Sequence, residues 1–571
     1  MHPHSRRYRS LRRALLACVV SLAAAPAVAA DVTPERLTNP EPGNWLMNHR
    51  TYDAQRFSPL AAINKTNVKA MKLAYAVAIG GTSVTENLES TPLAEDGFLY
   101  VVDLWGVVYK IDGRSGDLGR IVWRMDPGQE KVPDANRGAA LWGNFVISVA
   151  NHPPRLIATS RDNGKVAWET GLADGQNGLQ FTAAPLVVKD KIIVGASGGD
   201  QGVRSFLLGL DAATGKLLWK KYTVPAPGEP GSETWKDNHN AWQTGGGAMW
   251  VTGSYDPATN QVLWGTGNPV PWSDPYYRPG DNLYTDSLVS WDPDTGRMNW
   301  YHQYTPGDMW DYDAAGTHIL FDATVGGQER KLVAHAGRNG FLYSFERANG
   351  QTVLAKPYME KINWTAGIDQ KTGKPVDYDP GRDVQVYSGQ ANYTLERPTR
   401  HMCPALTGGN NYFPSSYSRR TGMLYIPAYS MCNDATLDQE AIKKGVYFSR
   451  ISKFERSESD LIMANPATGE VKKRTHSIFS NTAGALTTAG GLVFTAFTDG
   501  TFAAYDDETL EQLWKINVGT GFNAPPISFE AGGRQYVAIL SGLSKISRAR
   551  HDQTPELREL RNQTMLFVFG L

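Results

Sequence analysis

The sequence of 571 residues is poor in cysteine and has no excess of charge of either sign. It contains three cysteines, no C-x-x-C-H motif, and 57 basic against 57 acidic residues. Without that motif, no c-type haem is attached to the chain. The balanced charge shows no basic patch, so we expect no nucleic-acid partner. After the first 30 residues no apolar run reaches roughly 18 residues, so we predict no membrane-spanning helix.

Residues 1–30 have the parts of a secretory signal peptide. Five arginines and no acidic residue accompany an apolar run from Ala14 to Ala25, and Ala27-Val28-Ala29-Ala30 offers cleavage after Ala29 or Ala30. Paired arginines in this stretch leave a twin-arginine signal open. The mature chain, residues 31–571, would carry 52 basic and 57 acidic residues, a net charge of −5.

Two cysteines remain once the signal is removed. Cys403 and Cys432 form an even pair in an exported chain. Such a pair favours one disulfide in an oxidising compartment. Two free, buried thiols are the alternative.

A short motif recurs along the chain from about residue 74. Each copy has an apolar strand, an Asp or a substitute, a turn that contains Gly in all copies but the last, and a Trp or an apolar residue at a similar distance. Chance recurrence of Thr-Gly turns is the alternative to hairpins whose Trp docks on the neighbouring sheet. The seven copies lie at 111–123, 158–168, 210–219, 291–300, 345–354, 464–469 and 505–514.

Periodic sheet units with a Trp signature are typical of β-propellers. The stretches 73–75 and 563–571 each lack a hairpin, and together they would form an eighth blade that closes the ring. We therefore predict an all-β, eight-bladed propeller of four-stranded antiparallel sheets with Trp-docking repeats, a single domain over residues 31–571. Residues 31–70 would form an arm across the body. We expect the insertions 225–245, 355–400 and 433–460 on one face.

The stretch Thr305–Asp313 concentrates acidic and aromatic side chains. Asp311 and Asp313 are two residues apart, so on an extended segment their carboxylates would point the same way. Two adjacent carboxylates raise each other's pKa unless a cation lies between them. An acidic surface loop is the alternative interpretation.

The chain contains several short motifs that match those of a known family in the same order, from Arg50-Thr51-Tyr52 to Gln535–Gly542. It resembles the quinoprotein alcohol dehydrogenases over nearly all the mature chain. The resemblance implies a periplasmic enzyme that oxidises a small alcohol to an aldehyde by hydride transfer to metal-bound pyrroloquinoline quinone (PQQ). It also implies a separate soluble cytochrome c as electron acceptor. A homodimer, a sugar or polymeric alcohol substrate, and a non-enzymatic propeller scaffold remain open.

The resemblance assigns a set of cofactor-binding residues. Arg137 suits this role because a guanidinium binds a carboxylate in a bidentate fork, and PQQ has three carboxylates. An ordinary ion pair for Arg137 and an ordinary core position for Trp250 are the alternatives. The implied set is Glu89, Arg137, Thr182, Ser197, Gly198, Gly199, Trp250, Arg338 and Asn411.

The resemblance also implies the catalytic and metal-binding residues. Asp311 would be the base and Arg338 the cation over the reactive carbonyl. Carboxylate and amide oxygens suit a hard cation, Ca²⁺ or a trivalent lanthanide. Asp313 adds a carboxylate where calcium-dependent members have a neutral residue, which favours the lanthanide; a turn-capping role is the alternative. The implied ligands are Asp200, Asn268, Asp311 and Asp313, and a bridge like Cys403–Cys432 is also implied.

The sequence departs from the family pattern in four ways. Asp200 stands where most members have Glu, and Lys131-Val132 replace two adjacent cysteines that form a ring over the cofactor. Tyr412 and Thr482 stand where Trp is expected. We therefore expect a looser or differently shaped cofactor pocket.

Overall fold

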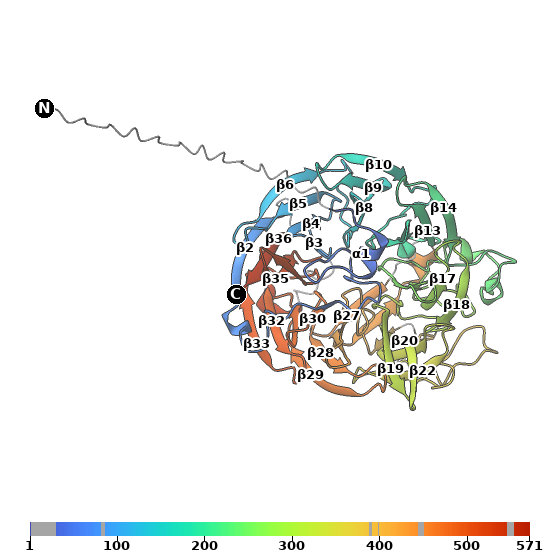
Figure 1. Cartoon of the computed structure of the whole chain (residues 1–571). Helices are drawn as coiled ribbons and strands as arrows, with labels where there is room; N and C mark the ends of the chain where they lie inside the picture. The colour runs from blue at the N-terminus through green and yellow to red at the C-terminus, as the bar shows by residue number, and fades with distance from the viewer. Residues whose placement is uncertain are drawn as a thin grey trace.

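The structure, a computed structural model, describes Met1 and residues 30–80, 86–387, 391–394, 396–397, 399–443, 450–544 and 553–571. The predicted signal peptide therefore lies outside the described residues except at its two ends. The described chain forms eight blades of four antiparallel strands around a central axis (Figure 1). A short parallel strand extends one blade, and a three-stranded sheet lies outside the blades. The predicted eight-bladed propeller is confirmed.

The first four blades follow one another along the chain, and each contains four consecutive strands. Their strands are β3 (Leu93–Glu95), β4 (Phe98–Val102), β5 (Val108–Asp112) and β6 (Arg120–Met125); β7 (Ala140–Trp142), β8 (Phe145–Asn151), β9 (Pro154–Ser160) and β10 (Val166–Gly171); β11 (Leu186–Val188), β12 (Lys191–Gly195), β13 (Phe206–Asp211) and β14 (Leu217–Tyr222); β15 (Ser254–Asp256), β16 (Gln261–Gly265), β17 (Ser287–Trp291) and β18 (Met298–Gln303).

The next three blades continue this order, with one insertion inside the sixth. Their strands are β19 (Ile319–Val325), β20 (Gln328–Ala336), β21 (Phe341–Glu346) and β22 (Thr352–Pro357); β24 (Ser416–Ser418), β25 (Met423–Tyr429), β28 (Ser459–Ala464) and β29 (Val471–Ser477); β30 (Ala485–Thr488), β31 (Leu492–Ala496), β32 (Thr501–Asp506) and β33 (Gln512–Asn517).

The eighth blade joins the two ends of the described propeller. Strand β2 (Lys72–Ala78) pairs with the C-terminal strand β36 (Met565–Gly570), which continues to β35 (Arg534–Ser541) and β34 (Ile527–Ala531). Figure 1 shows β2 and β36 side by side, next to the C-terminus. Strands from both ends of the described chain thus share one sheet, which holds the ring closed.

The recurring motif forms the two outer strands of seven blades. The six turn glycines have positive φ, and at Gly164, Gly215, Gly296 and Gly350 the missing side chain makes room for the Trp of the preceding blade. A Cβ at Gly164 would lie 2.8 Å from the ring of Trp123, and one at Gly215 would lie 2.5 Å from the ring of Trp168. The same glycine thus permits both the turn and the stacking, which explains why Gly and Trp recur together.

The predicted arm, residues 31–70, lies across one face of the propeller. It contains α1 (Pro34–Thr38), the two-residue strand β1 (Phe57–Ser58), which pairs with β30, and the short 3₁₀ helix η1 (Val68–Ala70). Arg56 is fully buried and donates hydrogen bonds to the carbonyls of Ala485 and Pro526, in the seventh and eighth blades. The arm therefore connects these two neighbouring blades, although it lies more than 400 residues before them in the sequence.

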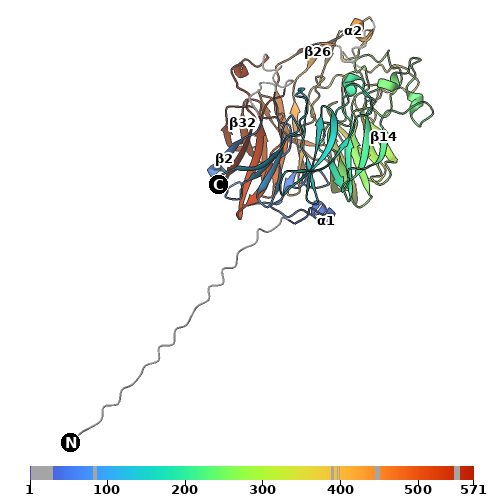
Figure 2. The same ribbon diagram turned by 90° about the horizontal axis from the view of Figure 1, so that it is seen from above.

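Insertions cover the opposite face. Figure 2 shows β26 and α2 on that face and α1 on the other. A small cap sheet there consists of β23 (Thr399–Met402), β26 (Asn433–Leu437) and β27 (Arg450–Phe454), and α2 (Gln439–Lys443) follows β26. The predicted disulfide Cys403–Cys432 is present and connects the end of β23 to the start of β26. Among the described helices, none has the length and apolar character needed to cross a membrane.

Three further 3₁₀ helices lie in connections between strands of the third and fourth blades. They are η2 (Gly199–Gln201), η3 (Ser232–Thr234) and η4 (Ala241–Thr244); a later one, η6 (Pro555–Leu557), precedes β36.

Candidate active site

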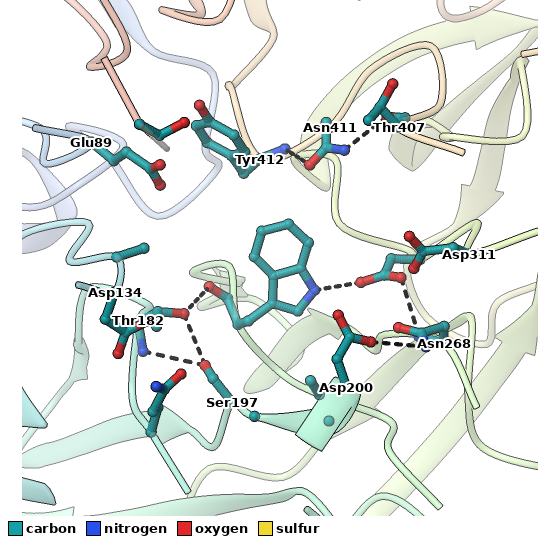
Figure 3. A pocket seen from close by; sticks show the side chains of 18 of the residues that line it. Glu89, Asp134, Thr182, Ser197, Asp200, Asn268, Asp311, Thr407, Asn411 and Tyr412 are labelled. Carbon is teal, nitrogen blue, oxygen red and sulfur yellow. Dashed lines mark hydrogen bonds between the residues drawn. The ribbon is translucent and has the colours of Figure 1, made fainter. Parts of the chain in front are cut away.

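A cavity of about 670 Å³ is lined by every catalytic, cofactor-binding and metal-binding residue predicted from the sequence. Its size lies within the range of about 300–1,000 Å³ that is usual for small-molecule and cofactor sites. Its described lining has two basic side chains, Arg137 and Arg338, against five carboxyl groups. Figure 3 shows Glu89, Asp134, Thr182 and Ser197 on one side, facing Asp200, Asn268 and Asp311 on the other. We call these two sides the Arg137 end and the Arg338 end.

A buried ion pair marks the Arg137 end. Arg137 Nη2 lies 2.8 Å from Glu89 Oε2, and both side chains are at least nine-tenths buried. Burial raises the pKa of Glu89, and the charge of Arg137 offsets this only in part. The guanidinium also lies 4.8 Å from the ring centre of Trp250 and 4.9 Å from that of Tyr412. This end therefore offers one cation between two aromatic rings.

Hydrogen bonds hold Trp250 in place from both sides. Its carbonyl accepts from Arg137 Nη1 at 3.1 Å and from the Thr182 hydroxyl at 3.2 Å. Its indole Nε1 donates to Asp313 Oδ2 at 2.5 Å. The hydroxyls of Thr182 and Ser197 lie 2.9 Å apart. Trp250 thus connects the two ends of the cavity, which an ordinary core Trp would not do.

Arg338 lies between the two carboxylates of the acidic stretch. Its Nη2 is 3.1 Å from Asp311 Oδ2, and its Nη1 is 3.0 Å from Asp313 Oδ1. Burial lowers the pKa of Arg338, but the charges of Asp311 and Asp313, together with those of Asp308 and Asp200, more than offset this and raise its pKa above the ordinary value. The cation expected between the two acids is therefore an arginine from the fifth blade.

The predicted extended geometry of Asp311 and Asp313 is wrong. Residues 304–318 form no strand, and Asp311 has a φ of 71°. The fully buried Asp308 shapes the loop, because its carboxylate accepts from the backbone N–H groups of Trp310, Asp311 and Tyr312 at 3.1, 2.9 and 3.2 Å. Burial raises the pKa of Asp308 to about 6. The two carboxylates converge on Arg338 through this turn and not through strand alternation.

Asn268, itself a predicted metal ligand, connects two others, Asp313 and Asp200. Its backbone N–H donates to Asp313 Oδ1 at 3.3 Å, and its Nδ2 donates to Asp200 Oδ1 at 3.3 Å. The Arg338 end therefore holds three carboxylates and one amide against a single guanidinium. Buried negative charge in excess of the protein's own cations favours a bound cation, and oxygen donors suit a hard one. The residues present fit the implied metal ion.

The 406–412 loop forms another wall of the cavity. Gly408 has a φ of 77°, and a Cβ there would lie 2.5 Å from Arg338 Cβ, so only glycine lets the loop approach. Arg338 Nη2 donates to the Leu406 carbonyl at 2.5 Å. Asn411 Nδ2 donates to the Thr407 carbonyl at 2.8 Å, so the Asn411 side chain stabilises its own loop as well as lining the cavity.

Sequence reasoning missed several lining residues. Pro133, Asp134 and Ala135 line the cavity, whereas its described lining includes neither Lys131-Val132 nor Thr482. Burial raises the pKa of Asp134 to about 6. Phe454 reaches the cavity from the cap sheet, beside Tyr429 and Leu406. No local motif marks these positions, since loops and an insertion bring them to the site.

Comparison with known proteins identifies the family. The family described as PQQ, glucose/ethanol/alcohol dehydrogenase, beta-propeller domain, matches residues 45–358 and 458–537. The chain belongs to the quinoprotein alcohol dehydrogenases. Two relatives are quinoprotein alcohol dehydrogenase PedH of Pseudomonas putida, 34% identical over 94% of this chain and 93% of the relative, and a quinoprotein ethanol dehydrogenase of Pseudomonas putida, 34% identical over 92% and 90%.

A solved structure supports the same conclusion for this quinoprotein. A europium-containing methanol dehydrogenase superposes with a TM-score of 0.84 at 28% identity, covering 94% of this chain and 99% of that one. The alternative interpretation of the chain as a non-enzymatic propeller scaffold is therefore wrong. The protein is a PQQ-dependent alcohol dehydrogenase.

Proposed function

We propose that this quinoprotein is a periplasmic enzyme that oxidises a small alcohol to an aldehyde by hydride transfer to PQQ beside a metal ion. Electrons would then pass to a separate soluble cytochrome c. The observation that carries the proposal is the Arg338 end, where Asp311 and Asp313 share one arginine and carboxylates outnumber cations. We further propose cleavage near Ala29 or Ala30 and one propeller domain over residues 31–571.

The residues of the Arg137 end would bind the cofactor. Arg137 offers a guanidinium to a carboxylate, and Thr182 and Ser197 offer hydroxyls close by. Trp250 offers a flat apolar face whose orientation is fixed by its two sets of hydrogen bonds. We propose Glu89, Arg137, Thr182, Ser197, Gly198, Gly199, Trp250, Arg338 and Asn411 as the cofactor-binding set.

Asp311 and Arg338 would perform the catalytic roles. When bound, PQQ supplies an electrophilic carbonyl that takes the hydride from the alcohol carbon. Asp311 would take the hydroxyl proton as general base. For this role its carboxylate must lie within hydrogen-bond reach of the alcohol oxygen. Arg338 keeps the Asp311 carboxylate ionised and directed into the cavity, because it pairs with Oδ2 at 3.1 Å. Burial excludes bulk water from this pair.

Asp200, Asn268, Asp311 and Asp313 would bind the metal ion, and we favour a trivalent lanthanide over Ca²⁺. Asp313 supports this choice, because a third carboxylate offsets more of a trivalent charge. Its Oδ1 already faces Asn268 and Arg338, so the side chain points to the proposed ligand cluster and does not merely cap a turn. The europium in the methanol dehydrogenase with this fold supports the same preference.

The proposal is tested with purified mature protein freed of bound metal. Turnover of an alcohol panel is measured with added PQQ, first without metal, then with Ca²⁺ and with La³⁺, using an artificial electron acceptor. We expect alcohol oxidation that needs both PQQ and metal and is faster with La³⁺. Oxidation of sugars but not alcohols under these conditions would contradict the proposed substrate class. Reduction of an added cytochrome c would test the acceptor separately.

A further inference from the structure

A second cluster of metal-ligating atoms lies outside the cavity, at the base of the cap sheet. His401 on β23 is the cross-strand partner of Asp434 on β26, and the disulfide Cys403–Cys432 closes the same pair of strands. His401 Nε2 lies 3.5 Å from Cys403 Sγ, and the ligand atoms of His401, Cys403 and Cys432 all lie within 4.8 Å of one another. Among the described residues that line the cavity, none belongs to this cluster.

The orientation of His401 is that of a metal-binding histidine. Its Nδ1 lies 2.8 Å from Asp434 Oδ1, and its other nitrogen faces the sulfur. A carboxylate on one ring nitrogen fixes the tautomer and leaves the second nitrogen to bind a metal. The two cysteines are buried, while the His401 side chain is 38% exposed. Two sulfurs and one imidazole thus lie close together, and His401 is the member of the cluster that solvent reaches.

We propose that reduction of the Cys403–Cys432 disulfide creates a binding site for a thiophilic divalent cation, Zn²⁺. A dithiol reductant would supply two electrons and two protons, so that the S–S bond breaks and the reductant becomes a disulfide. Binding of Zn²⁺ then releases both thiol protons and leaves two thiolates and the neutral His401 imidazole as ligands. A water molecule completes the tetrahedral set that Zn²⁺ prefers.

The cluster is mechanically connected to the catalytic end of the cavity. The carbonyl of Pro404 accepts from the Tyr312 hydroxyl at 2.6 Å, and Asn433 Oδ1 accepts from the Leu406 backbone N–H at 2.8 Å. Leu406 in turn accepts from Arg338. The disulfide links the two segments that carry these contacts, at Pro404 and at Asn433. After reduction, a Zn²⁺ ion bound by both cysteines would link the same two segments.

The test compares oxidised and reduced mature protein, with disulfide reduction verified by thiol counting and the fold by circular dichroism. Zn²⁺ affinity is measured by competition with a chromophoric chelator, and Co²⁺ serves as a spectroscopic probe of thiolate ligation. His401→Ala and Asp434→Ala are the informative variants. His476→Ala is the matched control, since His476 Nδ1 lies 2.9 Å from Asp460 Oδ1 on an exposed strand without a neighbouring disulfide.

We expect one additional Zn²⁺ in the reduced protein, with a thiolate-to-cobalt charge-transfer band that the oxidised protein lacks. Asp434→Ala should weaken this site by about tenfold or more, His401→Ala should weaken it further, and His476→Ala should leave it unchanged. Three results would each overturn the proposal: no extra cation after reduction, equal affinity in His401→Ala, or a disulfide that cannot be reduced while the protein stays folded. None of these readouts depends on PQQ or on alcohol turnover.

Discussion

The two ends of the cavity each hold one buried arginine, but they balance its charge differently. Arg137 faces the single carboxylate of Glu89, whereas Arg338 faces both Asp311 and Asp313, with Asp200 connected through Asn268. The Arg137 end therefore holds an ion pair beside aromatic rings, with Asp134 as a second carboxyl group nearby, and the Arg338 end sets three carboxylates against one guanidinium. The same cavity can thus receive an anionic, planar group at one end and a cation at the other.

The largest effect is expected from removing the proposed base at the Arg338 end. Asp311→Asn keeps the size of the side chain but removes its ability to take a proton. We expect alcohol turnover to fall by about 10²–10⁴-fold with either Ca²⁺ or La³⁺, the usual contribution of a general base. PQQ binding, followed by its absorption spectrum, should persist. Asp383→Asn, at an exposed side chain, is the control, and undiminished turnover in Asp311→Asn would exclude this residue as the base.

The excess negative charge at the same end is tested through Asp313. Asp313→Ala should weaken lanthanide binding by about 3–5 kcal/mol, because a buried charge loses its partner, and it should spare calcium-supported turnover. Terbium luminescence titration measures the affinity directly. Asp313→Asn keeps an acceptor for the indole N–H of Trp250, so it separates charge from packing. Equal terbium affinity in the wild type and both variants would remove Asp313 from the ligand set.

At the Arg137 end the expected loss concerns the cofactor. Arg137→Ala should weaken PQQ binding by about 2–5 kcal/mol, the cost of truncating one partner of a buried charge pair. Titration of the metal-loaded protein with PQQ measures this loss, and thermal unfolding checks that the fold is retained. Arg114→Ala, at a side chain that is 56% exposed, is the control. Wild-type PQQ affinity in Arg137→Ala would contradict the proposed role.

The smallest effect is a pH dependence from Glu89. Burial raises its pKa in the folded protein above the ordinary value of 4.5. Between the two pKa values the folded protein keeps a proton that the unfolded chain has lost, so stability falls as the pH rises through that window. Glu89→Gln removes this penalty. Its melting temperature relative to wild type should therefore increase as the pH rises from about 4.5, and a constant difference would count against a raised pKa.

The blades could be predicted from sequence because their determinants are local. In most copies a Gly with positive φ and a Trp at a similar distance define the hairpin, and the contact of Trp123 with Gly164 recurs at Gly215, Gly296 and Gly350. The individual site residues were found through their resemblance to a known family. All of them line one cavity, but their chemical roles remain predictions.

The shape of the acidic loop could not be predicted, because distant residues determine it. Arg278, fully buried, donates to the carbonyl of Asp308 as well as to that of Trp272, and Arg338 arrives from the next blade. The prediction that Asp311 and Asp313 point the same way because they lie on an extended strand was therefore wrong, although the two carboxylates do converge. Asp134 and Phe454 escaped detection for a similar reason, since a loop and an insertion bring them to the cavity without a local motif.

The most direct test of the central claim is metal-dependent alcohol turnover by the PQQ-loaded protein. Metal-free protein is supplied with PQQ and an alcohol, and turnover is followed as La³⁺ or Ca²⁺ is added. The account predicts negligible turnover without metal and the higher rate with La³⁺, because three carboxylates at the Arg338 end face a single guanidinium. Turnover that is the same without metal, or that is supported by Ca²⁺ and indifferent to La³⁺, would contradict it.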